Sequence, residues 1–115
     1  MPSKNNNPKS YNEELYVKKP INSLILFGIY SVATKKEQCA FERLVKECFA
    51  LFPKAFSFSR YKEWPDSRKL DRPLRFLRRK KLISGDPKNY FSLTKLGNQI
   101  AGDIAEALKQ TRLKI

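Results

Sequence analysis

The sequence is poor in the residues on which enzyme chemistry usually depends. It contains no histidine, so the commonest general base and metal ligand is missing. Its two cysteines, Cys39 and Cys48, are too few for a zinc site. The eleven acidic residues are scattered, whereas a metal-dependent nuclease needs clustered carboxylates, and no glycine-rich phosphate loop is present. We therefore expect a protein that is not an enzyme and that holds no metal or cofactor.

Long apolar runs are also missing. No run approaches the ~20 residues that cross a bilayer, and the N-terminus lacks the pattern of a signal peptide. Cys39 and Cys48 lie nine residues apart on one predicted helix, which places them on opposite faces and disfavours a disulfide. These features favour a cytoplasmic protein with reduced thiols and no membrane partner.

Negative charge is scarce as well. The chain has 24 lysines and arginines against 11 acidic residues, so its formal net charge is +13. A charge of this size on a chain of 115 residues, which is the length of one domain, predicts an anionic partner. Nucleic acid is the most economical candidate.

Much of the positive charge lies between residues 67 and 81, where eight basic residues accompany a single acid, Asp71. Leu70, Leu74 and Leu77, with the aliphatic stem of Lys81, recur at helical spacing and define one apolar face. Such a helix is suited to pack on one side and to meet phosphate on the other. Pro73 either kinks this helix or lies in the first turn of a helix that begins near Asp71.

The residues after this helix predict two short strands and a further helix. Leu82 and Ile83 begin the first strand, residues 85–89 have turn chemistry, and residues 90–93 return as the second strand. Thr94 is placed to cap the helix that follows.

Residues 69–77, the step Leu82-Ile83 and residues 93–97 resemble the winged helix-turn-helix repressors of the MarR and PadR type. In those families a recognition helix ends in a Gly-Leu-Ile-like step into the wing, which closes on a Leu-Thr-x-x-Gly-like step. This chain departs from that pattern at Lys81, which stands where the family usually has glycine, and at Pro73. The resemblance implies a mainly α fold with a small β-wing: a three-helix core, a two-stranded wing and a long C-terminal helix.

We expect three segments along the chain. Residues 1–19 are polar and Asn-rich and predict a flexible N-terminal arm. Its apolar residues could anchor the end of the arm or pack on a second subunit: Tyr11, Leu15, Tyr16 and Val17. Residues 20–97 would form the winged helix-turn-helix domain. Residues 98–115 would form the C-terminal helix.

Within the domain, the apolar residues 24–32 favour a first helix over a strand, because Pro20 or Asn22 can start it. Thr34 and Glu37 have the spacing of a capping box that opens a second helix reaching Phe52. On that helix Cys48 falls on the core side and Cys39 on the polar side.

Residues 54–65 are longer than the turn of a standard helix-turn-helix. Phe56, Phe58, Tyr61 and Trp64 indicate either a packed connection or a short helix over residues 59–64. These aromatics could stack on unpaired bases, but a satellite hydrophobic cluster is favoured.

The C-terminal helix carries an apolar stripe that is longer than a small wing domain can cover. In the resembling families this helix often makes a dimer, and the stripe predicts a homodimer here; the alternative is a helix folded back on its own domain. The dimer-interface candidates are Leu96, Ile100, Ile104 and Leu108, with Leu113 and Ile115 extending the stripe.

The expected function is sequence-specific binding of double-stranded DNA by a small transcriptional regulator, associated with the nucleoid when bound. The alternative is a protein-interaction module within a larger nucleic-acid-associated complex. The candidates for reading bases are Arg68, Lys69, Arg72 and Arg75, since arginine pairs bidentately with guanine in the major groove. The candidates for phosphate contacts are Arg78, Arg79, Lys80, Lys88 and Asn89.

Overall fold

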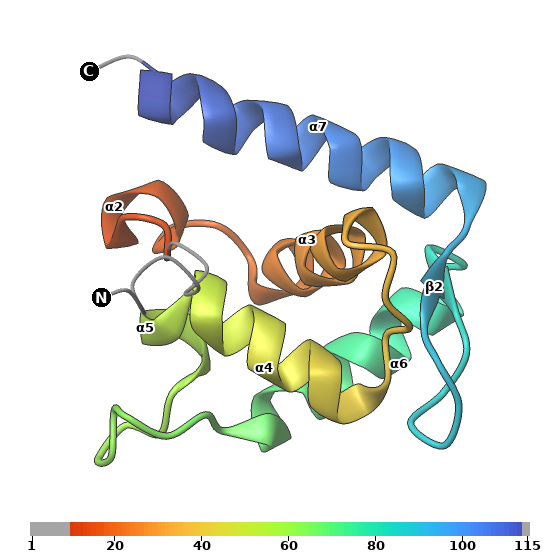
Figure 1. Cartoon of the computed structure of the whole chain (residues 1–115), viewed down its shortest axis with the longest axis horizontal. Coiled ribbons are helices and arrows are strands. Elements are labelled where there is room, and N and C mark those ends of the chain that lie inside the picture. The colour runs from red at the N-terminus through yellow and green to blue at the C-terminus, as the bar shows by residue number, and fades with distance from the viewer. Residues whose placement is uncertain (1–9, 114–115) are drawn as a thin grey trace.

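Helix α3 (Ile21–Thr34) is the central element of the fold. The computed structural model of the chain describes residues 10–113, with side chains to residue 109 (Figure 1). α4 (Phe41–Leu51), α6 (Asp71–Arg79), α7 (Lys95–Leu113) and the strand β2 (Ser92–Leu93) all contact α3. Residues 24–29 are consecutively buried, which accounts for the lack of a polar face. The prediction of a helix here, and not a strand, is confirmed.

The described residues form a mainly helical structure with one two-stranded antiparallel sheet, which confirms the predicted class at that level. The smaller elements are α2 (Glu13–Tyr16), α5 (Pro53–Phe56), the 3₁₀ helix η1 (Ser67–Leu70) and the strand β1 (Ile83–Ser84). Within this part of the chain, no helix combines the length and apolarity required to cross a membrane.

The prediction of a flexible arm over residues 1–19 is wrong for residues 10–19, which are part of the folded body; residues 1–9 lie outside the described residues. Tyr16 is buried, and its hydroxyl accepts a hydrogen bond from the backbone N–H of Lys54 at 3.1 Å. Tyr11 packs with Phe27 and Phe52 at ring separations of 5.9 and 5.6 Å. The anchoring role suggested for Tyr11 and Tyr16 is therefore confirmed, whereas Val17 is 57% exposed, so its anchoring role is wrong.

The helix expected from Thr34 begins later, at Phe41, so the capping-box prediction is wrong. Thr34 is the last residue of α3, and its hydroxyl donates to the Ser31 carbonyl at 2.7 Å. An extended segment before α4 places Cys39 in the interior, where its carbonyl accepts a hydrogen bond from the Phe91 N–H at 2.9 Å. Burial raises the pKa of the Cys39 thiol to about 12. The expectation of a polar-face Cys39 is thus wrong, whereas Cys48 is in the core as predicted.

The connection between α4 and α6 is neither uniformly packed nor helical over residues 59–64. Phe56 is buried at the end of α5, and Ser57 and Pro65 form an isolated antiparallel bridge that closes a loop. Tyr61 and Trp64 are 54% and 55% exposed, so the prediction that they pack in a satellite cluster is wrong.

Helix α6 begins at Asp71, directly after η1, so Pro73 falls in its first turn, where its missing N–H is tolerated. Lys81, two residues after the end of the helix, has a left-handed backbone conformation at φ 61°. At this point the N–H of Leu82 donates to the Leu77 carbonyl at 3.0 Å, and the N–H of Lys81 donates to the Arg78 carbonyl at 3.0 Å. These are the two bonds of a Schellman motif, which usually has glycine at this position. Lys81 is exposed, so its expected place on the apolar face is wrong.

The hairpin pairs Ile83 with Leu93 and Ser84 with Ser92. After it, the Thr94 hydroxyl accepts a hydrogen bond from the Gly97 N–H at 3.0 Å, as expected of a residue that caps α7. α7 extends past α3 and packs against it (Figure 1).

The buried face of α7 is offset from the predicted stripe. Ala101 and Leu108 are fully buried, Ile100 and Ile104 are half-buried, and Leu96 is 52% exposed. A fully buried Leu108 cannot also contact a partner, so its prediction as a dimer residue is wrong. Ile115 and the side chain of Leu113 lie outside the described part of the chain.

Candidate nucleic-acid interface

Helix α6 presents a row of arginines on the side opposite its leucines. Leu74 and Leu77 are buried, whereas Arg72, Arg75 and Arg79 are exposed. The three arginines are spaced by three and four residues, which places them on one face of a helix with 3.6 residues per turn. The apolar seam therefore holds the helix in place and turns the cationic row toward solvent.

The arginine row borders a shallow depression of about 410 Å³. Its lining is formed by Asn22, Arg72, Pro73, Arg75, Phe76 and Arg79. Asn22 belongs to the first turn of α3, which contains no acidic residue. The positive end of that helix dipole thus adds to the three guanidinium charges. The sequence reasoning placed Asn22 only at a helix start, because nothing in the sequence shows which helix lies beside it.

The arginines of α6 differ in their local contacts. Arg75 pairs with Asp71 at 3.1 Å, and both side chains are more than half exposed. The Arg79 guanidinium and the Lys80 ammonium lie 5.9 and 5.6 Å from the centre of the Phe76 ring. Phe76 is half-buried, so it steadies the long cationic chains of both residues at the end of the helix.

Two predicted base-reading residues are engaged elsewhere. Lys69 is half-buried and its ammonium donates to the Ser57 carbonyl at 2.8 Å. Arg68 donates to both carboxylate oxygens of Asp66, at 3.1 and 3.2 Å, and lies 5.4 Å from the Phe58 ring centre. The hydrogen bonds from Arg68 lower the pKa of Asp66. Lys69 and Arg68 thus connect the loop to η1 through these hydrogen bonds.

The hairpin turn is held by Asp86. Its carboxylate accepts from the backbone N–H groups of Lys88 and Asn89, at 2.9 and 3.1 Å, and from the Asn89 amide at 3.2 Å. Lys88 is exposed at the tip. The turn therefore offers one lysine on a fixed backbone, whereas the Asn89 side chain serves the turn itself.

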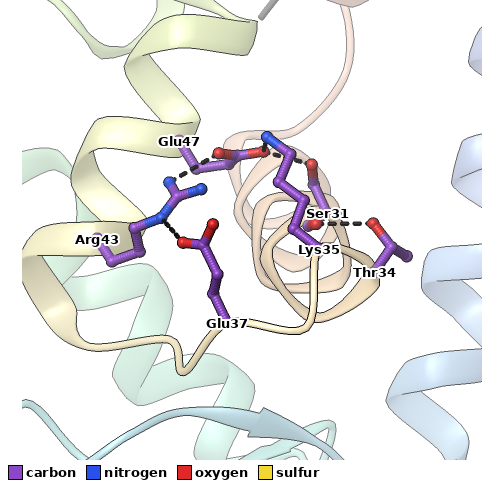
Figure 2. A network of polar contacts seen from close by, with 6 residues as sticks. All are labelled: Ser31, Thr34, Lys35, Glu37, Arg43 and Glu47. Carbon is purple, nitrogen blue, oxygen red and sulfur yellow. Dashed lines mark hydrogen bonds and ion pairs between the residues drawn. The ribbon is translucent and has the colours of Figure 1, made fainter.

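A polar network that sequence reasoning missed joins α3 to α4 (Figure 2). Glu47 is 1% exposed, and its carboxylate accepts hydrogen bonds from Ser31 and from Lys35 and Arg43, the last two at 2.8 Å. Arg43 also pairs with Glu37 at 2.6 Å. Burial acts to raise the pKa of Glu47, but the hydrogen bonds from Lys35, Ser31 and Arg43 outweigh it, so the pKa is lowered.

The signal for this network was present in the sequence. Glu47 follows Leu44 by three residues and precedes Leu51 by four, so an acid stands on the apolar face of its helix. The network is structural, because its charges satisfy one another. Among the described residues, no group of three histidine, cysteine or acidic side chains could hold a metal ion.

Comparison with known proteins finds no family model, no curated protein and no solved structure that matches this chain.

Proposed function

We propose that this chain binds double-stranded DNA through α6 and the β1–β2 hairpin, as a small transcriptional regulator. The observation that carries the proposal is the arginine row Arg72, Arg75 and Arg79, which borders a depression and faces away from the buried leucines. A concentration of guanidinium groups on one exposed helix face is the kind of surface that binds the phosphates of a nucleic-acid backbone.

The order of elements supports this assignment. α3, α4 and α6 are followed by a two-stranded hairpin and a long helix, which is the order of a winged helix-turn-helix domain. In that arrangement α6 is the recognition helix and the hairpin is the wing. The connection between α4 and α6 is longer than the usual three or four residues and contains α5, a loop and η1.

The contacts of the basic residues suggest which of them would contact bases and which would contact phosphates. Arg72 and Arg75 have exposed side chains in the N-terminal part of the row and are proposed to meet base edges. The phosphate contacts are assigned to the flanking residues: Arg78, Arg79, Lys80 and Lys88.

The test uses duplexes selected from a random pool. We expect Arg72→Ala and Arg75→Ala each to weaken the selected duplex by roughly 1–3 kcal/mol, and Lys88→Ala to weaken all duplexes equally and lower the salt slope by about one. Fluorescence anisotropy across a salt series measures both quantities.

A matched control is Lys109→Ala, which removes one positive charge from the exposed side of α7. It should leave both the affinity and the salt slope unchanged. If the α6 variants bind like the parent, α6 is not the reading helix. If no duplex binds even at low salt, the protein-interaction alternative replaces this proposal.

A further inference from the structure

We propose that the loop of residues 57–65 is a binding site for unpaired bases of a single-stranded nucleic acid, with Tyr61 and Trp64 as its stacking surface. The site is distinct from the α6 face and extends the proposed function to a second kind of nucleic-acid structure. This inference does not require that the chain also binds a duplex.

The first observation is an exposed pair of aromatic rings. Tyr61 and Trp64 are each more than half exposed, with ring centres 5.3 Å apart and planes inclined by 22°. By contrast, Tyr16, Phe52 and Phe56 are fully buried. An exposed, nearly parallel pair leaves flat ring faces in water, where they add nothing to the core and are available to a flat ligand.

The second observation is that the backbone holds this pair in place. The N–H of Phe58 bonds the Trp64 carbonyl at 3.0 Å, the N–H of Trp64 bonds the Tyr61 carbonyl at 3.0 Å, and the N–H of Asp66 bonds the Phe56 carbonyl at 2.7 Å. At the base of the loop, the Lys69 ammonium bonds the Ser57 carbonyl. A loop closed by these bonds presents its rings with little ordering left to do on binding.

The third observation is the charge around the rings. Arg60 and Lys62 are exposed on either side of Tyr61, accompanied by one acid, Glu63. At the foot of the loop, Arg68 lies over Phe58 and leads into the basic helix α6. The loop and the hairpin both project on the side of the molecule away from α7 (Figure 1).

Cations interleaved with aromatic rings fit a polynucleotide better than an apolar protein surface. The rings supply a face on which a base stacks, and the cations follow the phosphates, a combination that binds single strands with little sequence preference. In a duplex the faces of the bases are already stacked on one another, so flat rings at a loop tip have nothing to bind there.

The experiment uses Trp64, the single tryptophan of the chain, as its own reporter. At low salt the protein is titrated with oligothymidylate or oligouridylate of roughly twelve nucleotides, within the range of known single-strand site sizes, and with a duplex of the same length. We expect either single strand to quench the tryptophan fluorescence and the duplex to leave it nearly unchanged. A stronger effect of the uridylate would indicate a contact to the 2′-hydroxyl, and equal effects a contact to bases alone; both support the site.

Substitution separates stacking from charge. Tyr61→Ala should weaken binding of a labelled single strand about 5- to 150-fold, which corresponds to the 1–3 kcal/mol measured for loss of one base–aromatic stack. The same variant should bind the duplex as the parent does. Val17→Ala is the control, since Val17 is an apolar residue that is 57% exposed and lies outside this loop, α6 and the β1–β2 hairpin, and it should leave single-strand affinity unchanged.

Three results would overturn this inference: single strands that do not quench Trp64, duplexes that quench it equally, or equal losses in the Tyr61 and Val17 variants. The first would reassign the exposed pair to a protein partner. Because duplex affinity is measured in parallel, failure of this site is distinguishable from failure of the proposed function. A urea titration checks that each variant remains folded.

Discussion

Glu47 shows how a charge is kept inside a small core. One of its carboxylate oxygens accepts from Ser31 and Lys35, and the other accepts from Arg43. The side chains of Lys35 and Arg43 are 40% and 21% exposed, so both cations still reach water. This arrangement fixes α4 against the end of α3 without leaving a buried cation to be neutralised.

Replacing Glu47 with glutamine should lower the free energy of unfolding at neutral pH. The loss should be about 1.5–3 kcal/mol, the range for hydrogen bonds to charged groups. It should fall below the 3–5 kcal/mol of a fully buried pair, because the partner cations reach water. Urea titrations of parent and variant at pH 7 measure the difference.

The same pair of proteins gives a pH test. The pKa of Glu47 is lowered in the folded state. Its contribution to the free energy of unfolding is therefore complete above the pKa of the unfolded chain, ~4.3, and is lost as pH falls through the pKa of the folded state. The difference in free energy of unfolding between the parent and the Glu47→Gln variant should therefore disappear as pH falls below about 4. Glu42→Gln, at an exposed position of the same helix, should stay within about 0.5 kcal/mol of the parent. A gap that persists in acid would contradict this account.

Lys81 occupies a backbone conformation that suits glycine better. Its φ is 61°, and left-handed geometry costs a residue with a Cβ roughly 1–2 kcal/mol. We expect Lys81→Gly to raise the midpoint of urea unfolding, with a gain of about 0.5–1 kcal/mol after the added freedom of the unfolded chain is subtracted.

Lys80→Gly is the matched control, since it removes the same side chain one residue earlier, at φ −82°. It should lower stability by about 0.5–1 kcal/mol, because glycine gains nothing in a right-handed conformation. Equal effects of the two substitutions would show that charge, and not backbone geometry, decides stability here.

At the scale of elements, α7 contains two glycines with opposite roles. A Cβ added to Gly97 would lie 1.9 Å from the Leu82 carbonyl oxygen, whereas one added to Gly102 meets nothing within 4 Å. Gly97→Ala should therefore force α7 away from the hairpin and destabilise the fold by more than about 2 kcal/mol. Gly102→Ala should stabilise it by about 0.5–1 kcal/mol, since alanine is the better helix former. Thermal or urea unfolding of the two variants measures these changes in stability. If Gly97→Ala left stability unchanged, α7 would not be held against the hairpin at Gly97.

The elements with a distinct hydrophobic pattern were predictable from the sequence. α3 contains the apolar run of residues 24–29, α6 combines leucine and arginine at helical spacing, and turn residues separate the two strands. The stripe on α7 was given the wrong phase for a geometric reason. A repeat of four residues advances 400° along a helix, so it drifts by about 40° at each step. Leu96 and Leu108 consequently point about 120° apart, and of these two only Leu108 is buried.

Other features depend on contacts that a single sequence does not encode locally. Cys39 is buried because Phe91, far along the chain, bonds its carbonyl. Likewise, Thr34 and Glu37 satisfy the spacing of a capping box, yet Glu37 pairs with Arg43 and α3 continues to Thr34. In the candidate interface, the exposed row on α6 was expected, whereas Asn22 and the engagement of Lys69 required the tertiary structure.

At the scale of the whole molecule, a homodimer remains a prediction that α7 would have to support without Leu108. Leu108→Ala should cost about 2–5 kcal/mol whatever the oligomeric state, because it opens a cavity beneath α7. Leu96→Glu should leave the fold intact, because Leu96 is 52% exposed, and should convert a dimer into a monomer. Light scattering at tens of micromolar checks this, and a monomeric parent protein would end the dimer hypothesis.

The central place of α3 also affects how the chain is made. Its apolar surface is complete once Thr34 has been synthesised, but α7, which covers one side, begins only at Lys95. At 5–20 residues per second, a ribosome needs roughly 3–12 s to bridge that interval. During this time one side of α3 stays uncovered in the growing chain, so the yield of folded protein in the cell should depend on chaperones that hold nascent chains and on the pace of translation.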